Sequence, residues 1–116
     1  MSLTTITIGG VDYVSYATLA EANARLAVDP VRSAAWSALT DDQKGINLVA
    51  GTNRLDLLDW EGEKAGGATQ ENAWPRTGVT YKDGTAVPDD EVSHGVEVAT
   101  ILLAGTISLT PATSGA

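Results

Sequence analysis

The N-terminal segment alternates between polar and apolar positions in the way that a β-hairpin does. Residues 5–8 alternate threonine with isoleucine, and Val11 and Tyr13 repeat the alternation after Gly9-Gly10. A period of two is typical of a strand with one buried face, and a Gly-Gly pair supplies the positive φ angles of a two-residue turn. The pattern therefore predicts a hairpin over residues 3–14.

The next apolar positions follow a helical period. Residues 16–27 carry their larger side chains on one face at 3.6-residue spacing. Ser15 can cap the free amides of a first turn, and the proline after Asp29 disfavours helix at that residue. We therefore expect a first helix from about Ser15 to Asp29. A short helical segment over residues 31–39 should follow, stabilised by the packing of Trp36.

The clearest local signal is the start of a third helix. Thr40 and Gln43 have the spacing of a capping box, and the two aspartates between them lie at the positive end of the helix dipole. The helix is expected to extend to about Asp59. Its apolar stripe at 3.6-residue spacing includes Ile46, Val49, Ala50, Leu57 and Trp60.

The second half of the chain combines loops with one more helix. Residues 61–73 have no period and are predicted to form a loop, and Asp83-Gly84 predicts a tight turn. The last helix is predicted to begin at Pro88, because three acids follow in its first turn. From Gly105 onward the residues are small and polar, which is typical of a segment that does not fold alone.

These elements predict a mainly α protein, built as a small bundle of about three to four helices. An N-terminal β-hairpin precedes the bundle, a short β-hairpin or extended loop precedes the last helix, and an extended C-terminal arm follows it. The length of 116 residues fits one domain, which we assign to residues 1–105, with the arm at residues 106–116. The predicted core consists of Leu19, Leu26, Trp36, Ile46, Val49, Leu57, Trp60, Val92, Val96 and Leu103.

Composition narrows the classes of function. Fifteen acidic residues against seven basic ones give a formal net charge of −8, which disfavours binding through many phosphate contacts. The absence of cysteine excludes a disulfide framework, a thiolate zinc site, an iron–sulfur cluster and a cysteine nucleophile. The longest apolar run, residues 96–104, is far shorter than the ~20 residues of a membrane span, so no membrane partner is expected.

The residues that could catalyse a reaction or hold a metal form no recognisable motif. His94 is the only histidine, and it cannot act with Ser93, because neighbours within one helical turn point apart. The acids between Asp56 and Glu63 match no calcium loop and are interpreted as a solvated helix end. The glycine pairs fit turns and not a phosphate-binding loop. We therefore predict a protein that is not an enzyme, with no cofactor and no metal.

The three tryptophans, Trp36, Trp60 and Trp74, allow two interpretations. Tryptophan is common in cores and interfaces, and it also stacks on unpaired bases. Stacking requires a basic groove, and near Trp74 only Arg76 and Lys82 are basic, with several acids close in sequence. Core or interface positions are therefore favoured, and a base-stacking surface is the alternative.

Six segments of the chain resemble, in order, one family of small proteins of tailed bacteriophages and prophages. They are residues 12–28, Trp36, residues 40–56, Trp60-Glu61-Gly62, residues 73–79 and residues 87–92. The most specific segment is Ala73-Trp74-Pro75-Arg76-Thr77-Gly78-Val79, followed by Val87-Pro88. The family is that of the head-to-tail connector adaptors, or head completion proteins, many of which are labelled DnaT-like single-stranded DNA-binding proteins. The resemblance covers residues 10–105.

The resemblance implies a structural virion protein that forms a dodecameric ring between the portal and the tail. Its implied partners are other copies of the chain, the portal protein, a tail-side stopper or tail terminator protein, and double-stranded DNA that passes through the lumen without sequence-specific binding. The implied location is the head-to-tail neck of the virion, and the host cytoplasm during assembly. The alternative function is a single-stranded DNA-binding accessory protein of replication.

Certain residues are candidates for the subunit or portal interface of such a ring. Ile107 and Leu109 would point the same way in an extended arm, which suits strand addition to an exposed sheet edge. The hairpin would offer such an edge at a subunit boundary. The candidate interface residues are Ile6, Ile8, Trp74, Pro75, Arg76, Ile107 and Leu109.

Overall fold

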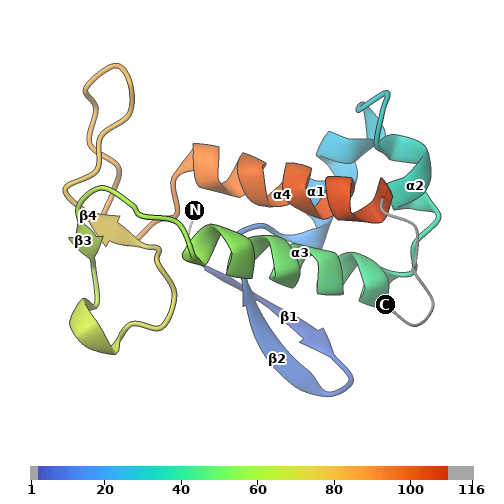
Figure 1. Ribbon diagram of the computed structural model, residues 1–116, viewed down its shortest axis with the longest axis horizontal. Helices are drawn as coiled ribbons and strands as arrows, with labels where there is room; N and C mark the ends of the chain where they lie inside the picture. Colours follow the sequence, from blue (N-terminus) through green and yellow to red (C-terminus); the bar gives the residue numbers. More distant parts are fainter. Residues whose placement is uncertain (1–2, 110–116) are drawn as a thin grey trace.

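The computed structural model describes residues 3–109, which fold into a small, mainly helical domain. Figure 1 shows the two longest helices, α3 (Asp41–Asp56) and α4 (His94–Leu109), side by side and antiparallel. Helix α1 (Leu19–Ala27) and the short helix α2 (Ser33–Ser37) pack against this pair. The prediction of a mainly α protein with about three to four helices is confirmed at this level.

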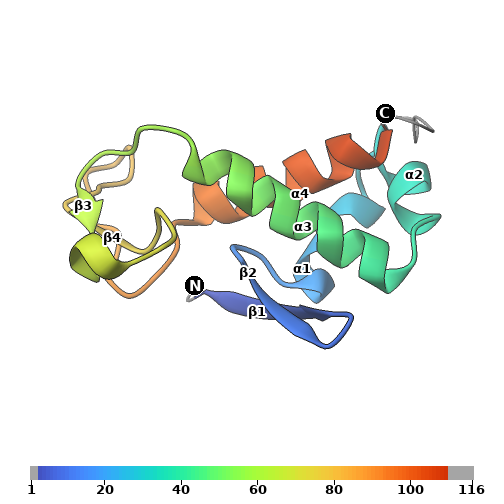
Figure 2. The ribbon, with the colours of Figure 1, turned by 60° about the horizontal axis from the view of Figure 1, so that its bottom comes forward.

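Two short antiparallel hairpins lie outside the helices. Strand β1 (Thr4–Ile8) pairs with β2 (Val11–Ser15), and Figure 2 shows this hairpin on one side of α3. Strand β3 (Glu63–Lys64) pairs with β4 (Arg76–Thr77) at the opposite end of α3 from α2. The predicted N-terminal hairpin is therefore confirmed.

The segment predicted as a loop contains some regular structure. Within residues 61–73 lie strand β3 and a 3₁₀ turn, Gly67–Thr69. The turn predicted at Asp83-Gly84 is present as a short hairpin-like turn. Its ends are joined by a bridge between Thr80 and Ala86.

Helix α1 begins later than its sequence suggested. Thr18 caps it: its Oγ1 accepts a hydrogen bond from the backbone N–H of Glu21 at 3.1 Å, and the Glu21 carboxylate accepts one from the N–H of Thr18 at 3.2 Å. Ser15, the predicted cap, ends β2, and its hydroxyl donates to the carbonyl of Ala17 at 2.7 Å. A complete capping box therefore outcompetes the single serine three residues earlier.

The predicted capping box of α3 is confirmed. The Thr40 hydroxyl accepts a hydrogen bond from the N–H of Gln43 at 3.2 Å, and the Gln43 side chain accepts one from the N–H of Thr40 at 2.9 Å. The helix ends at Asp56, because residues 57 and 58 close its last turn with tighter i to i−3 hydrogen bonds.

The Thr40 cap predicts a measurable loss of stability. Thr40→Ala removes the acceptor for one free amide at an exposed helix end, so we expect the free energy of unfolding to fall by about 1 kcal/mol. Urea unfolding followed by circular dichroism measures this loss. Thr40→Ser keeps the acceptor oxygen and should lose much less; equal losses in the two variants would contradict the capping role.

Helix α4 also begins later than predicted and ends later. Ser93 caps it by accepting a hydrogen bond from the N–H of Val96 at 3.2 Å, whereas Pro88 belongs to a preceding turn. The helix continues to Leu109, so the predicted extended arm is wrong for residues 106–109. The remaining arm residues, 110–116, lie outside the described residues.

The core consists of two clusters spaced along α3 and α4. The first lies toward the β3–β4 end and contains Tyr16, Leu55, Ala73, Trp74, Val87, Val92 and Val96. The second lies toward α2 and contains Ala17, Ala22, Leu26, Trp36, Leu48, Ile101 and Ala104. Of the remaining predicted core residues, Leu19, Val49, Trp60 and Leu103 are half-buried.

Two predicted core residues, Ile46 and Leu57, are exposed, so the predicted face of α3 was wrong. The buried face of α3 contains Leu48, Thr52 and Leu55 together with two glycines. A Cβ at Gly51 would lie 3.0 Å from the carbonyl oxygen of Thr100, and one at Gly45 would lie 2.8 Å from Cγ2 of Ile6. Close approach of α4 and β1 at these glycines, and not the widest apolar stripe, sets the phase of α3.

Candidate functional site

The segment with the most specific sequence pattern, residues 73–79, places its tryptophan in the core of the same chain. Trp74 is 2% exposed in the first core cluster, and its ring meets that of Trp60 edge to face, with centroids 5.6 Å apart. Pro75 follows through a cis peptide bond and is half-buried. The prediction that Trp74 forms an interface is therefore wrong, because the pocket that holds its ring is formed by the same chain.

A buried hydrogen-bond network holds this segment against the end of α3. The Tyr16 hydroxyl donates to the Asp56 carboxylate and accepts a hydrogen bond from the N–H of Trp74 at 3.1 Å. Asp56 also accepts from the N–H of Ala73 at 3.0 Å and from Asn72 Nδ2 at 2.8 Å. Burial, together with the hydrogen bond to Asp56, raises the pKa of Tyr16, so its hydroxyl remains a donor. The network fixes residues 72–74 and engages both carboxylate oxygens of Asp56.

The side chain of Arg76 forms hydrogen bonds with the backbone on both sides of β3. Its side chain is 9% exposed and donates to backbone carbonyls only. The acceptors are the carbonyl oxygens of Glu61 (2.8 Å), Gly62 (2.9 Å), Ala73 (3.0 Å) and Trp60 (3.3 Å). The predicted interface role of Arg76 is therefore wrong, because its donors hold the loop before β3 in place.

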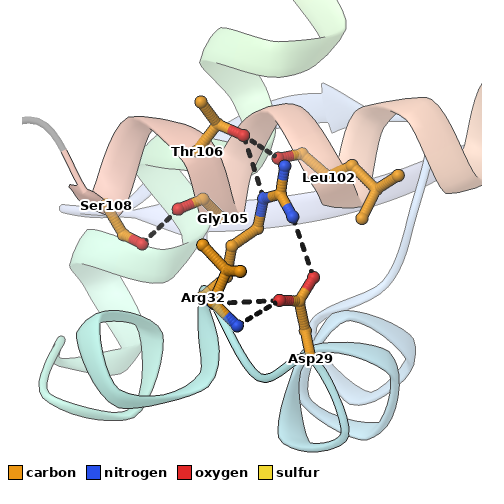
Figure 3. Close-up of polar contacts among 7 residues, drawn as sticks. Asp29, Arg32, Leu102, Gly105, Thr106 and Ser108 are labelled. Carbon is orange, nitrogen blue, oxygen red and sulfur yellow. Dashed lines mark hydrogen bonds and ion pairs between the residues drawn. The ribbon is translucent and has the colours of Figure 1, made fainter.

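Other basic side chains are also bound within the chain. Figure 3 shows Arg32 between the corner that precedes α2 and the last turns of α4: its guanidinium donates to Asp29 at 3.0 Å and to the Thr106 hydroxyl at 3.0 Å. Lys44 lies 5.7 Å from the ring centroid of Trp36, and Lys64 Nζ donates to the carbonyl of Gln70 at 2.9 Å. Together with Arg76, four of the seven basic side chains thus have partners inside the domain.

The contact in Figure 3 also explains why α4 continues past Gly105. Arg32 anchors Thr106, and Gly105 packs so tightly that a Cβ there would lie 2.9 Å from Cδ2 of Leu26. Residues 105 and 106 are therefore held in α4. Ile107 is half-buried and Leu109 is exposed in the last turn of the helix, and neither belongs to a strand.

The first hairpin presents an apolar face of which only one half is covered. In the strand register, Ile6 lies opposite Tyr13, and Ile8 lies opposite Val11, so these four side chains share a face. Ile6 packs into the second core cluster and meets α3 at Gly45. Val11 and Tyr13 are 52% and 41% exposed. The face therefore continues from the interior of the domain onto its surface.

The edges of this hairpin have no strand partner among the described residues. Within residues 3–109, β1 and β2 pair only with each other, so each has one edge without a strand partner. Proteins commonly guard such edges with lysine, proline or a bulge. Neither strand contains lysine or proline, and the one charged side chain, that of Asp12, accepts a hydrogen bond from the Thr7 hydroxyl at 2.6 Å. The hairpin is thus suited to contact another polypeptide chain.

Only the β1 half of this surface belongs to the predicted interface, and the β2 half does not. The sequence pattern predicts an interface role for Ile6 and Ile8, whereas for Val11 and Tyr13 it predicts only a strand. The Gly9-Gly10 turn was the available signal, because a two-residue turn fixes which residues face each other across the hairpin.

The side chains considered for catalysis and metal binding do not come together. His94 is exposed at the first turn of α4, and the hydroxyl of Ser93 is occupied as its cap. Over residues 3–109, no three histidine or acidic side chains are placed to hold a metal ion. In the same range no helix has the length and apolar character to cross a membrane.

One family model matches residues 1–114 of the chain, and it is described as "Putative DnaT-like ssDNA binding protein". Neither a curated protein nor a solved structure matches the chain.

Proposed function

The chain belongs to the DnaT-like ssDNA binding protein family, and we propose that it acts as a structural subunit of a dodecameric adaptor ring at the neck of a tailed bacteriophage. In this proposal the ring joins the portal protein to a tail-side stopper or tail terminator protein, and double-stranded DNA passes through its lumen. The protein is not an enzyme. Its site of action is the virion, after assembly in the host cytoplasm.

The observation that carries this proposal is the half-covered apolar face of the first hairpin. An apolar face that runs from the core to the surface, beside strand edges without partners, is a surface that favours contact with protein. In a ring, each subunit contacts its neighbours through two different surfaces, and a hairpin has two different edges. We infer that the hairpin is the boundary between neighbouring copies, with Ile6 and Ile8 lying beside Val11 and Tyr13 on the same apolar face.

The charge distribution supports passage of DNA more than retention of it. Binding of single strands needs basic side chains along a groove and aromatic rings to stack on bases. Here four of the seven basic side chains are engaged inside the domain, and Trp36 and Trp74 are buried. A lumen lined by a protein with a net charge of −8 per copy would repel the DNA backbone.

The alternative function is single-stranded DNA binding, which the family description names. One observation favours it: Tyr81 is exposed beside Lys82, at the turn before α4. This pair would have to provide stacking and charge together. The alternative predicts an affinity that falls steeply with salt and that depends on these two residues.

The test compares assembly and DNA binding in the same variants. Native mass spectrometry of the purified chain over a range of concentrations should give a closed dodecamer, and Tyr13→Lys should abolish it because a charge would enter the apolar contact. Tyr13→Phe keeps the apolar ring and should assemble normally. Both variants should keep the circular dichroism spectrum of the parent chain.

The DNA arm of the test uses fluorescence anisotropy with a labelled oligo-dT strand at two salt concentrations. We expect no salt-dependent binding. A chain that stays monomeric at every concentration and binds oligo-dT through Tyr81 and Lys82 would overturn the ring proposal in favour of the alternative.

A further inference from the structure

A groove of about 290 Å³ lies beside strand β1. It is lined by residues 4–7 of β1, by Thr18 and Leu19 at the start of α1, and by Asp41, Asp42 and Gly45 at the start of α3. None of the lining residues belongs to β2, so the groove follows the side of β1 that β2 does not cover. The unpaired edge of β1 therefore opens onto a hollow between the hairpin and two helices.

The turn of the hairpin determines which backbone groups point toward this edge. Both glycines of the turn have positive φ angles, 59° and 81°, so the two-residue turn is closed by a hydrogen-bonded pair, Ile8 and Val11. Hydrogen-bonded and non-hydrogen-bonded pairs alternate along an antiparallel ladder, which makes Thr5 and Thr7 non-hydrogen-bonded positions. Their N–H and C=O groups therefore point away from β2, and within residues 3–109 they form no hydrogen bond with another element.

The charged side chains of the groove are all acidic. Asp41 and Asp42 are exposed, and neither has an ion-pair partner among the described residues. The remaining side chains are threonines and two apolar residues, Ile6 and Leu19. Because side chains of a strand alternate between its two faces, a strand that fits here carries apolar residues toward the domain and positive charges that meet the aspartates.

We propose that β1 receives an extended segment of a partner protein with alternating apolar and basic side chains, which adds to the hairpin as a third strand. Main-chain hydrogen bonds to Thr5 and Thr7 give affinity, and Asp41 and Asp42 select the basic side chains. A second copy of this chain fits the edge less well, because its β2 edge would bring Asp12 to these acids and its β1 edge would bring another two aspartates.

Strand addition needs only the β1 edge, whereas the proposed ring rests on the apolar face of the hairpin. Either proposal can therefore fail without the other. A chain that stays monomeric contradicts the ring and leaves the strand addition open to the experiments below.

Hydrogen exchange of the full-length chain, resolved by residue with mass spectrometry, tests the strand addition. The probe is a short capped peptide of alternating lysine and valine. At saturation it should slow exchange of the Thr5 and Thr7 amides about tenfold or more, and it should leave those of Asp12 and Val14 on the opposite edge unchanged. Thr5 and Thr7 amides that already exchange slowly without the peptide would show that a second copy occupies the edge, and would overturn the proposal.

A peptide with glutamate in place of lysine tests the selection by charge. Fluorescence anisotropy with labelled peptides should give an affinity about tenfold or more lower for the glutamate peptide, and the difference should shrink at high salt. Asp41→Asn combined with Asp42→Asn should reduce this preference to less than about threefold. Asp89→Asn combined with Asp90→Asn changes an exposed pair outside the groove and should retain it. Equal affinities of the parent chain for the two peptides would overturn the proposal.

Proline substitutions test the edge itself. Thr5→Pro removes an N–H that points away from β2, so the hairpin should keep its circular dichroism spectrum while the affinity for the lysine peptide falls about tenfold or more. Val14→Pro makes the same change on the β2 edge, opposite Thr5 in the register, and should bind the peptide as the parent does.

N-methylated peptides make the test independent of how the proline variants fold. Methylation of one alternate set of peptide amides should abolish binding to the parent chain, because those amides face β1, and methylation of the other set should not. Equal binding of the two methylated peptides, or a folded Thr5→Pro variant with the affinity of the parent, would contradict strand addition.

Discussion

Trp74→Ala is expected to destabilise the domain by about 3–5 kcal/mol. The indole is the largest buried side chain of the first core cluster, and it meets Trp60 edge to face. Removing it leaves a cavity that the hydrogen-bonded backbone around it cannot close, since the N–H of Trp74 and that of Ala73 are both tied to the Tyr16–Asp56 network. Urea unfolding at one fixed protein concentration measures the loss, because association would add to the apparent stability.

The same variant distinguishes the two interpretations of the tryptophan. If Trp74 serves the core, Trp74→Phe should recover part of the stability, and oligo-dT affinity should not change in either variant. A Trp74→Ala chain that unfolds at the same urea concentration as the parent but loses affinity for single strands would show that the indole acts at the surface.

Leu48→Ala is expected to cost about 2–5 kcal/mol, whereas Leu57→Ala should cost less than about 0.5 kcal/mol. Leu48 is fully buried in the second core cluster, and Leu57 is 86% exposed at the end of α3. The two variants delete the same atoms from one segment of the chain, so each serves as the control for the other. Equal melting temperatures in the two variants would mean that Leu48 does not lie on the buried face of α3.

The local signals in the sequence predicted the elements better than their packing. Thr40 and Gln43 identified the start of α3 correctly, because a capping box is made of neighbouring residues and needs no tertiary contact. The Gly9-Gly10 pair identified the first hairpin for the same reason. In contrast, Pro88 and its acids have the features of a helix start, yet the Ser93 cap competes with it and begins α4.

The rotation of α3 and the candidate interface could not be predicted from the same signals. The buried face of α3 is defined by glycines that meet Thr100 and Ile6, residues far away in sequence. The sequence around Arg76 is typical of an interface residue, but in the structure its guanidinium donates to the carbonyl oxygens of residues 60–62. Glu97 falls in the apolar stretch of α4, and its place in a groove lined by polar side chains of α1 follows only from the packing of the two helices.

The separation of the core into two clusters gives each end of the domain its own optical probe. Trp36 lies in the cluster toward α2, and the Trp60–Trp74 pair lies in the cluster toward β3 and β4. In Trp36→Phe, all indole emission comes from the pair, so the fluorescence spectrum reports the environment of that end alone. Comparing its unfolding curve with that of the parent chain reveals whether the two ends lose their structure together or in sequence.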